Sequence, residues 1–272
     1  MTKIQMVAQK VADRGTSSPC VARTALQTEE LLAGMFLDKT IRDQIIGVSF
    51  AVMRRLSALE DIAERVEGAV AGALKLVARE GVDIQAHGRA VNLPSVPALR
   101  DDAELFLYTA KLALRDIASL FQPFFAKAFD HQYHQVRAWL EKEFGSDDPL
   151  LVLLNEDRVW IERIINMRNV IEHPTDSHGP ITIRDFTLAQ GETLTVVPPT
   201  WFLQEELPAL IADEMRAICT NLLTFYEDLV MDGLNRLDTI KLSEIVEIPV
   251  DERDPQFPKR LRRQFRFLRA ET

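Results

Sequence analysis

The sequence has little cysteine, glycine and proline, and it has no long apolar run. Its two cysteines, Cys20 and Cys219, lie too far apart to suggest a disulfide framework or a metal knuckle. Eleven glycines and 13 prolines in 272 residues are too few for a fibrous or low-complexity chain. No segment is apolar for long enough to cross a bilayer, and the start of the chain lacks a signal-peptide core. We therefore expect a cytoplasmic protein with reduced thiols and no membrane association.

The charge balance narrows the range of partners. The formal net charge is −9, so a nucleic acid would be repelled by the molecule on average. This charge argues against broad, unspecific adhesion to nucleic acid, but it does not exclude a local cationic site. The hydrophobic content of 47% is ordinary for a globular chain of this length, which can bury one large core or two small ones.

Apolar residues recur every three or four positions through most of the chain, a pattern typical of helices packed on one face. The longest segment ends before Gly81, a suitable C-terminal cap. It forms either one unusually long helix or two helices joined near Ser57, and we expect one long helix with a bend. Another helix is predicted to begin at Pro149 after the N-cap Asp148 and to stop before Pro174. The predicted helices span residues 40–80, 101–125, 129–144, 149–173 and from 208 to about 229.

The remaining segments complete the predicted architecture. Residues 81–98 are expected to form a connector, and two β-rich runs around Gly191 predict a hairpin over residues 181–197. The predicted fold is mainly all-α: an antiparallel helical bundle with one long N-terminal helix and an appended hairpin. The expected organisation is a polar lead-in (1–24), a single helical domain (25–250) and a basic C-terminal tail (251–272).

Two charged residues fall within the apolar sector of the predicted 149–173 helix. Asp157 and Arg168 lie about 16 Å apart along an ideal helix, so neither can neutralise the other. Each therefore needs a partner from another helix, another chain or a ligand, because an unpaired charge on a packed face is costly. His173 directly precedes Pro174, which disfavours the helical conformation at His173 and lets its side chain leave the helical path.

The segment Arg168-Asn169-Val170-Ile171-Glu172-His173 resembles the nuclease motif of the HEPN family. In this motif an Arg is followed by a polar residue and, after four to six intervening positions, by a His near the end of a bundle helix. The resemblance covers about residues 40–230 and includes the hairpin and the closing helix. It implies a HEPN-like fold and a dimeric ribonuclease, needing neither metal nor cofactor, that acts in defence, as a toxin or in a stress response. It also implies an inhibitor or antitoxin protein as a partner. Some toxin members carry a modified Tyr two residues after the His, where this chain has Thr175.

The residue types suit that chemistry. A neutral His173 could accept the proton of a ribose 2′-hydroxyl, or protonate the leaving 5′-oxygen, because its ordinary pKa is near neutrality. Arg168 offers a permanent forked cation to phosphate oxygens, and Asn169 could position the phosphate or the His. Such cleavage would leave a 2′,3′-cyclic phosphate and would spare DNA.

A structural role for the same residues is the alternative. His173 would then be a helix C-cap, and Arg168 would pair with an acid such as Asp116. The chain would in that case be a non-catalytic helical interaction or regulatory module.

Other candidate residues lie outside the motif. His178 follows it in a loop and could reach the same cleft. Asp130, His131 and His134 resemble a metal cluster, but no second cluster supports this interpretation, and we expect no metal. The C-terminal tail is basic and would be amphipathic if helical, through Leu261, Phe265 and Leu268. Two roles fit it equally: it holds RNA phosphates, or it docks on an acidic surface of its own body or of a partner. Its candidate binding residues are Lys259, Arg260, Arg262, Arg263 and Arg266.

Overall fold

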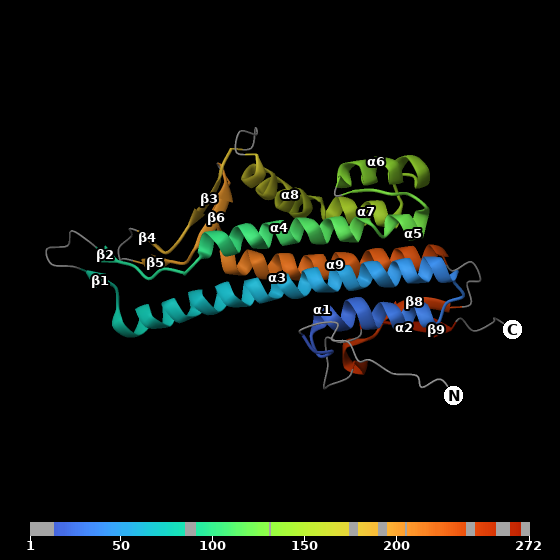
Figure 1. The fold of residues 1–272 in the computed structure, drawn as a ribbon, viewed down its shortest axis with the longest axis horizontal. Coiled ribbons are helices and arrows are strands. Elements are labelled where there is room, and N and C mark those ends of the chain that lie inside the picture. The colour runs from blue at the N-terminus through green and yellow to red at the C-terminus, as the bar shows by residue number, and fades with distance from the viewer. Residues whose placement is uncertain are drawn as a thin grey trace, which may run out of the picture.

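The computed structural model describes residues 14–84, 91–130, 132–173, 179–189, 195–204, 206–237, 243–253 and 262–267. Three long helices lie side by side along the molecule (Figure 1): α3 (Lys39–Glu80), α4 (Leu99–Ala118) and α9 (Ile211–Leu237). Each of the three contacts the other two. This arrangement confirms the prediction of a mainly helical bundle with one long N-terminal helix.

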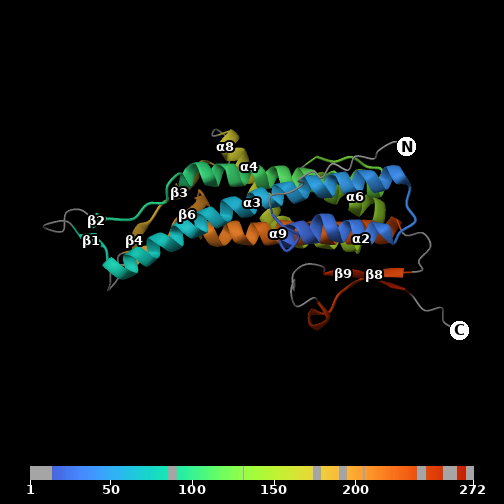
Figure 2. The ribbon, with the colours of Figure 1, turned by 60° about the horizontal axis from the view of Figure 1, so that its bottom comes forward.

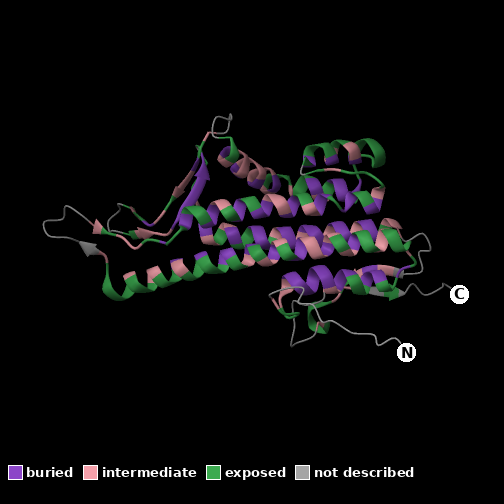
Figure 3. Cartoon of the chain, viewed as in Figure 1, coloured by how far each residue is buried: buried purple, intermediate pink, exposed green. Residues whose placement is uncertain are grey.

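The faces that these helices bury are largely those that the sequence pattern predicts. α3 is a single helix of 42 residues, with its N-cap at Asp38 and Gly81 at its C-cap. Its buried residues end at Val70, so the last turns project beyond the rest of the bundle and are exposed (Figure 3). On α4 the predicted core positions are all buried: Ala103, Phe106, Leu107, Ala110, Leu114 and Ile117. The same holds for α9, with Ile211, Met215, Ile218, Leu222, Phe225 and Leu229.

Two predicted helices are divided in the structure. The 101–125 segment forms α4 and, after a turn at Ser119 and Leu120, the separate helix α5 (Phe121–Phe125). The turn lets Phe121 and Phe125 pack against Trp139 of α6 (Tyr133–Phe144), a tertiary contact that local periodicity does not report.

The predicted 149–173 helix is divided at Asp157 into α7 (Pro149–Glu156) and α8 (Arg158–Glu172). Asp148 caps α7 as expected, accepting hydrogen bonds from the backbone N–H groups of Leu150 and Leu151 at 3.1 and 3.2 Å. The break changes which residues share a face. On α8 the buried residues are Ile161, Ile164, Met167 and Val170. Arg168 is one turn after Ile164 and two turns after Ile161, so it lies on the side of α8 that these residues share, and its side chain is 13% exposed.

The predicted hairpin is present and longer than expected. Strands β4 (Thr187–Ala189) and β5 (Thr195–Val197) pair antiparallel, and β3 (Ile181–Arg184) pairs with β6 (Thr200–Leu203) in the same sense. β6 also pairs with β7 (Ala209–Leu210), which leads directly into α9. The 81–98 connector likewise contains a short pair, β1 (Asp83–Ile84) with β2 (Val91–Asn92).

The predicted polar lead-in is wrong for residues 19–24, whereas residues 1–13 lie outside the described part of the chain. Helix α1 (Pro19–Val21) begins at Pro19 and runs on through the π-helix η1 (Ala22–Leu26) into α2 (Gln27–Ala33). Cys20 and Ala22 are fully buried, because this segment packs on α3 and α9. Among the described residues, no helix combines the length and the apolar character needed to span a membrane.

Candidate functional site

The predicted motif residues lie in the last turn of α8, where the chain leaves the bundle. His173 has φ −131° and ψ 75°, outside the helical region, as its position before Pro174 predicts. Its backbone N–H donates to the carbonyl oxygen of Asn169 at 2.7 Å, and the residue is exposed. The imidazole thus stands at the surface at the end of α8.

Arg168 lies against two neighbours. Its guanidinium carbon stands 5.1 Å from the centre of the Tyr108 ring on α4, and Nη2 is 2.8 Å from Oε1 of Glu172, one turn later on α8. The Arg168 side chain is 13% exposed and Glu172 is 34% exposed, so the pair is open to solvent on the Glu172 side. Asp116, the acid suggested by the sequence, instead accepts a hydrogen bond from Arg55 at 3.1 Å.

Lys111 is a member of this site that sequence reasoning missed. It stands on α4, which packs directly on α8. Its Nζ donates to Oδ1 of Asn169 at 2.9 Å and to Oε2 of Glu172 at 3.2 Å. A lysine within an amphipathic helix carries no local sign of such a role, because its partners lie on another helix.

A cavity of about 290 Å³ opens beside these residues, lined by Tyr108, Lys111, Leu112, Arg115, Asp130 and Glu172. Burial acts to raise the pKa of Glu172, but the hydrogen bond from Lys111 and the charges of Lys111, Arg168 and His173 outweigh it. The pKa of Glu172 therefore lies below its ordinary value, and its carboxylate is ionised at neutral pH. It is held by two cations at the edge of the cavity.

The basic tail occupies a different part of the molecule. Residues 263–267 form strand β9 (Arg263–Phe267), paired antiparallel with β8 (Ser243–Glu247), so the amphipathic helix considered for this segment is wrong. Lys259 and Arg260 lie outside the described residues, as do His131 and His178. The β8–β9 hairpin and the end of α8 lie on opposite sides of the bundle (Figures 1 and 2).

The described arginines of the tail all contact acids of their own chain. Arg262 pairs with Glu227 of α9 at 3.4 Å and with Glu247 of β8 at 3.2 Å. Arg263 pairs with Asp228 at 3.1 Å and Arg266 with Glu244. Of the two roles that the sequence left open, these contacts favour docking on the protein's own body.

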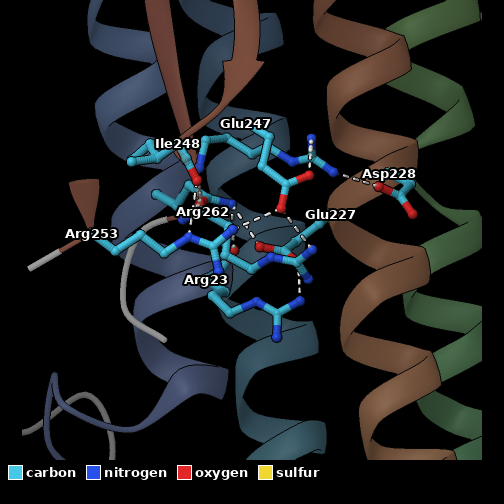
Figure 4. Close-up of polar contacts among 9 residues, drawn as sticks. Arg23, Glu227, Asp228, Glu247, Ile248, Arg253 and Arg262 are labelled. Carbon is cyan, nitrogen blue, oxygen red and sulfur yellow. Dashed lines mark hydrogen bonds and ion pairs between the residues drawn. The ribbon is translucent and has the colours of Figure 1, made fainter. Parts of the chain in front are cut away.

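Glu227 is the centre of this docking contact. Its side chain is 1% exposed and pairs with Arg23, which is 9% exposed, while Gln27 donates to its other oxygen at 3.0 Å. Figure 4 shows Arg23 and Arg262 both directed at this carboxylate, with Arg253 and Arg262 meeting at Glu247 above it. The amide oxygen of Gln27 in turn accepts from the backbone N–H groups of Arg262 and Arg263 at 2.7 and 3.0 Å. Glu227, on α9, thus links η1 and α2 to the C-terminal hairpin.

No group of His, Cys, Asp and Glu side chains suited to a metal ion is found within the described ranges. His134 is exposed on α6, as expected for a solvated helix surface. Asp157 also has a partner in its own chain, because its carboxylate accepts a hydrogen bond from Trp160 Nε1 at 2.8 Å. Burial, its largest influence, raises the pKa of Asp157, although the Trp160 bond lowers it.

The end of α8 therefore presents a forked cation, a second cation and an exposed imidazole around one carboxylate. Arg168 and Lys111 suit an anion with several oxygen atoms, and an imidazole can accept or donate a proton. Comparisons of the chain with family models, with curated proteins and with solved structures give no significant match.

Proposed function

We propose that this protein is a HEPN-like endoribonuclease that cleaves RNA without a metal ion. The observation that carries the proposal is the cluster at the end of α8. There Arg168 and Lys111 both pair with Glu172, and Lys111 also donates to Asn169, next to the exposed His173 and a cavity of about 290 Å³. The resemblance of residues 168–173 to the family's nuclease motif supports the same conclusion.

The proposed reaction uses the ribose 2′-oxygen as its nucleophile. That oxygen forms a new bond to phosphorus, and the bond from phosphorus to the 5′-oxygen breaks, leaving a 2′,3′-cyclic phosphate and a free 5′-hydroxyl. An imidazole accepts the proton of the 2′-hydroxyl, and an acid supplies a proton to the 5′-oxygen. Arg168 stabilises the negative charge that develops on the phosphate oxygens.

A homodimer completes this proposal. One cluster contains a single imidazole from the motif, whereas the reaction needs both a base and an acid. A two-fold dimer that brings two α8 ends together would supply one His173 for each task. A defence, toxin or stress-response role, held in check by an inhibitor or antitoxin protein, fits a nuclease of this kind.

A non-catalytic helical interaction module is the second candidate. The contact that favours it is the pairing of Arg168 with Glu172 of its own helix at 2.8 Å, which already neutralises the cation. Catalysis and scaffolding differ in their products, because a scaffold would leave RNA intact.

The test is to incubate the purified protein with mixed RNAs, with and without a chelator, and to identify the product ends. We expect cyclic phosphate ends in both conditions. His173→Ala should lower the cleavage rate about a hundredfold or more, the usual scale for a positioned acid–base group. Arg168→Ala should cost a similar factor, and Arg168→Lys should recover little of it, because a point charge does not replace a bidentate fork.

Two matched variants serve as controls. His134→Ala removes an exposed histidine of α6, and Arg137→Ala removes an arginine that is 18% exposed and pairs with Glu162 of α8 at 3.1 Å. Both should cleave at the wild-type rate. Arg168→Ala should also leave the free energy of unfolding almost unchanged, because Glu172 is part-exposed and keeps Lys111. Intact RNA after incubation with the wild-type protein, or cleavage that a chelator abolishes, would contradict the proposal.

A further inference from the structure

Glu172 accepts from two cations in the manner of a phosphate group. One carboxylate oxygen lies 2.8 Å from Nη2 of Arg168 and the other lies 3.2 Å from Nζ of Lys111. The two cations come from different helices, α8 and α4, and converge on one anionic group. Arginine and lysine contacts to separate oxygens of one group are also how proteins hold a phosphate.

The carboxylate leaves part of this cationic site unused. The Nε–H of Arg168 is buried and has no hydrogen-bond partner among the residues that the structure describes. A guanidinium binds an oxyanion best through two parallel N–H groups, and Glu172 engages one. A phosphate has more oxygens than a carboxylate, so it could contact Nη2 of Arg168 and still reach Lys111, while Nε stays covered.

The surroundings leave room for a ligand larger than the carboxylate. The cavity beside Glu172 has a volume of about 290 Å³, at the small end of the range for ligand pockets. Arg115, one turn after Lys111 on α4, lines it and makes no ion pair within the described part of the chain. Tyr108 lines it as well and presents its ring to Arg168.

Glu172 can leave its position if another anion takes its place. Its side chain is 34% exposed, so water can reach the carboxylate, whereas Arg168 and Lys111 are 13% and 18% exposed and need an anion beside them. Arg168 would keep its contact with the Tyr108 ring after Glu172 had moved.

We propose that Glu172 occupies the place of an RNA phosphodiester and must be displaced before RNA binds between Arg168 and Lys111. The carboxylate acts as an internal competitor, which keeps the two cations paired while the site is empty. This inference extends the proposed function, because it names Lys111 as a phosphate-binding residue and Glu172 as a brake on binding.

The test compares Glu172→Gln with Glu162→Gln as a matched control. Glu162 is also on α8 and also bridges two cations, Arg137 at 3.1 Å and Arg158 at 2.9 Å, but it does not line the cavity. The probe is a fluorescent single-stranded 2′-O-methyl oligonucleotide, which lacks the 2′-hydroxyl and resists cleavage, and the readout is its anisotropy. Glu172→Gln should bind the probe about tenfold more tightly, because it removes a competing charge close to both cations.

Binding of the probe tests the role of Glu172, and cleavage of RNA tests the proposed nuclease activity, so either one can fail without the other. Glu162→Gln should bind as the wild type does, and combining Glu172→Gln with Lys111→Met should cancel the gain. Unchanged or weaker binding by a folded Glu172→Gln protein overturns the inference, even where the wild type cleaves RNA. Tighter binding by Glu172→Gln upholds it even where no variant cleaves RNA, in which case the proposed nuclease activity fails.

Discussion

Two arginines show how burial decides the role of a charge. Arg168 is 13% exposed and pairs with Glu172, which is 34% exposed, so solvent can reach the carboxylate of this pair. Arg23 is 9% exposed and faces Glu227, which is 1% exposed. An isolated ion at such depth is costly, so this pair serves to satisfy two buried charges. The sequence pattern drew attention to Arg168 and passed over Arg23, because no local feature reveals a partner 204 positions away.

Arg23→Met should lower the free energy of unfolding by about 3–5 kcal/mol, because it leaves the carboxylate of Glu227 buried with a weaker set of partners. The control is Arg79→Met, which breaks an exposed pair in which Arg79 is 74% and Glu80 is 57% exposed, and which should leave stability unchanged. Urea unfolding followed by circular dichroism measures both. Equal stability of the two variants would show that Glu227 is satisfied without Arg23.

At the scale of elements, periodicity was informative wherever one helix packs along its whole length. The core faces of α4 and α9 followed from spacing alone, and the caps Asp148 and Gly81 followed from residue type. The breaks at Asp157 and after Ala118 did not follow, because the apolar pattern continues across both and tertiary packing decides them.

Strand β9 was missed for a related reason. Apolar residues spaced for a helix occupy the same segment as the apolar–polar alternation of Phe265, Arg266 and Phe267, which suits a strand. The choice is made by the partner strand Ser243–Glu247, which lies earlier in the chain and pairs with it. Arg262 and Arg263 then fall opposite the acids of α9.

Deleting residues 253–272 tests the role of the tail. We expect the melting temperature to fall, because β8 loses its partner strand and Glu227, Asp228 and Glu247 lose cations. The salt dependence of oligonucleotide binding should stay as it is, since Arg262, Arg263 and Arg266 are already paired with carboxylates and would release few counterions. Differential scanning fluorimetry and anisotropy at several salt concentrations measure the two effects. A flatter salt dependence after the deletion would instead place the tail on RNA.

At the scale of the molecule, the candidate site and the C-terminal hairpin lie on opposite sides of the bundle (Figures 1 and 2). On the hairpin side, ion pairs between buried and part-buried groups hold the surrounding segments to α9. The α4–α8 side carries the cavity and also two large exposed side chains of α4, Leu105 at 49% and Tyr108 at 45%. These two residues are one turn apart and therefore share a face of α4, with Tyr108 in contact with Arg168.

That face is where we expect the two protomers of the proposed dimer to meet. A two-fold contact over Leu105 and Tyr108 would bury apolar surface and bring two Arg168–His173 ends towards one cleft. Leu105→Lys should therefore convert the dimer to a monomer and lower RNA cleavage together with it, because like charges would face each other across the two-fold axis. Light scattering at micromolar concentration gives the mass, and the cleavage assay gives the activity.

Leu76→Lys is the matched control, since Leu76 is 44% exposed and lies near the end of α3, beyond Val70, the last buried residue of that helix. It should leave both mass and activity unchanged. A wild-type protein that is monomeric yet cleaves RNA would show that one His173 suffices, with water or another group as the second proton carrier. A Leu105→Lys protein that stays dimeric would show that the exposed face of α4 is not the dimer interface. If Leu105→Lys is monomeric and inactive while Leu76→Lys stays dimeric and active, catalysis depends on the dimer. This outcome is expected because one cluster holds one imidazole and the reaction needs a base and an acid.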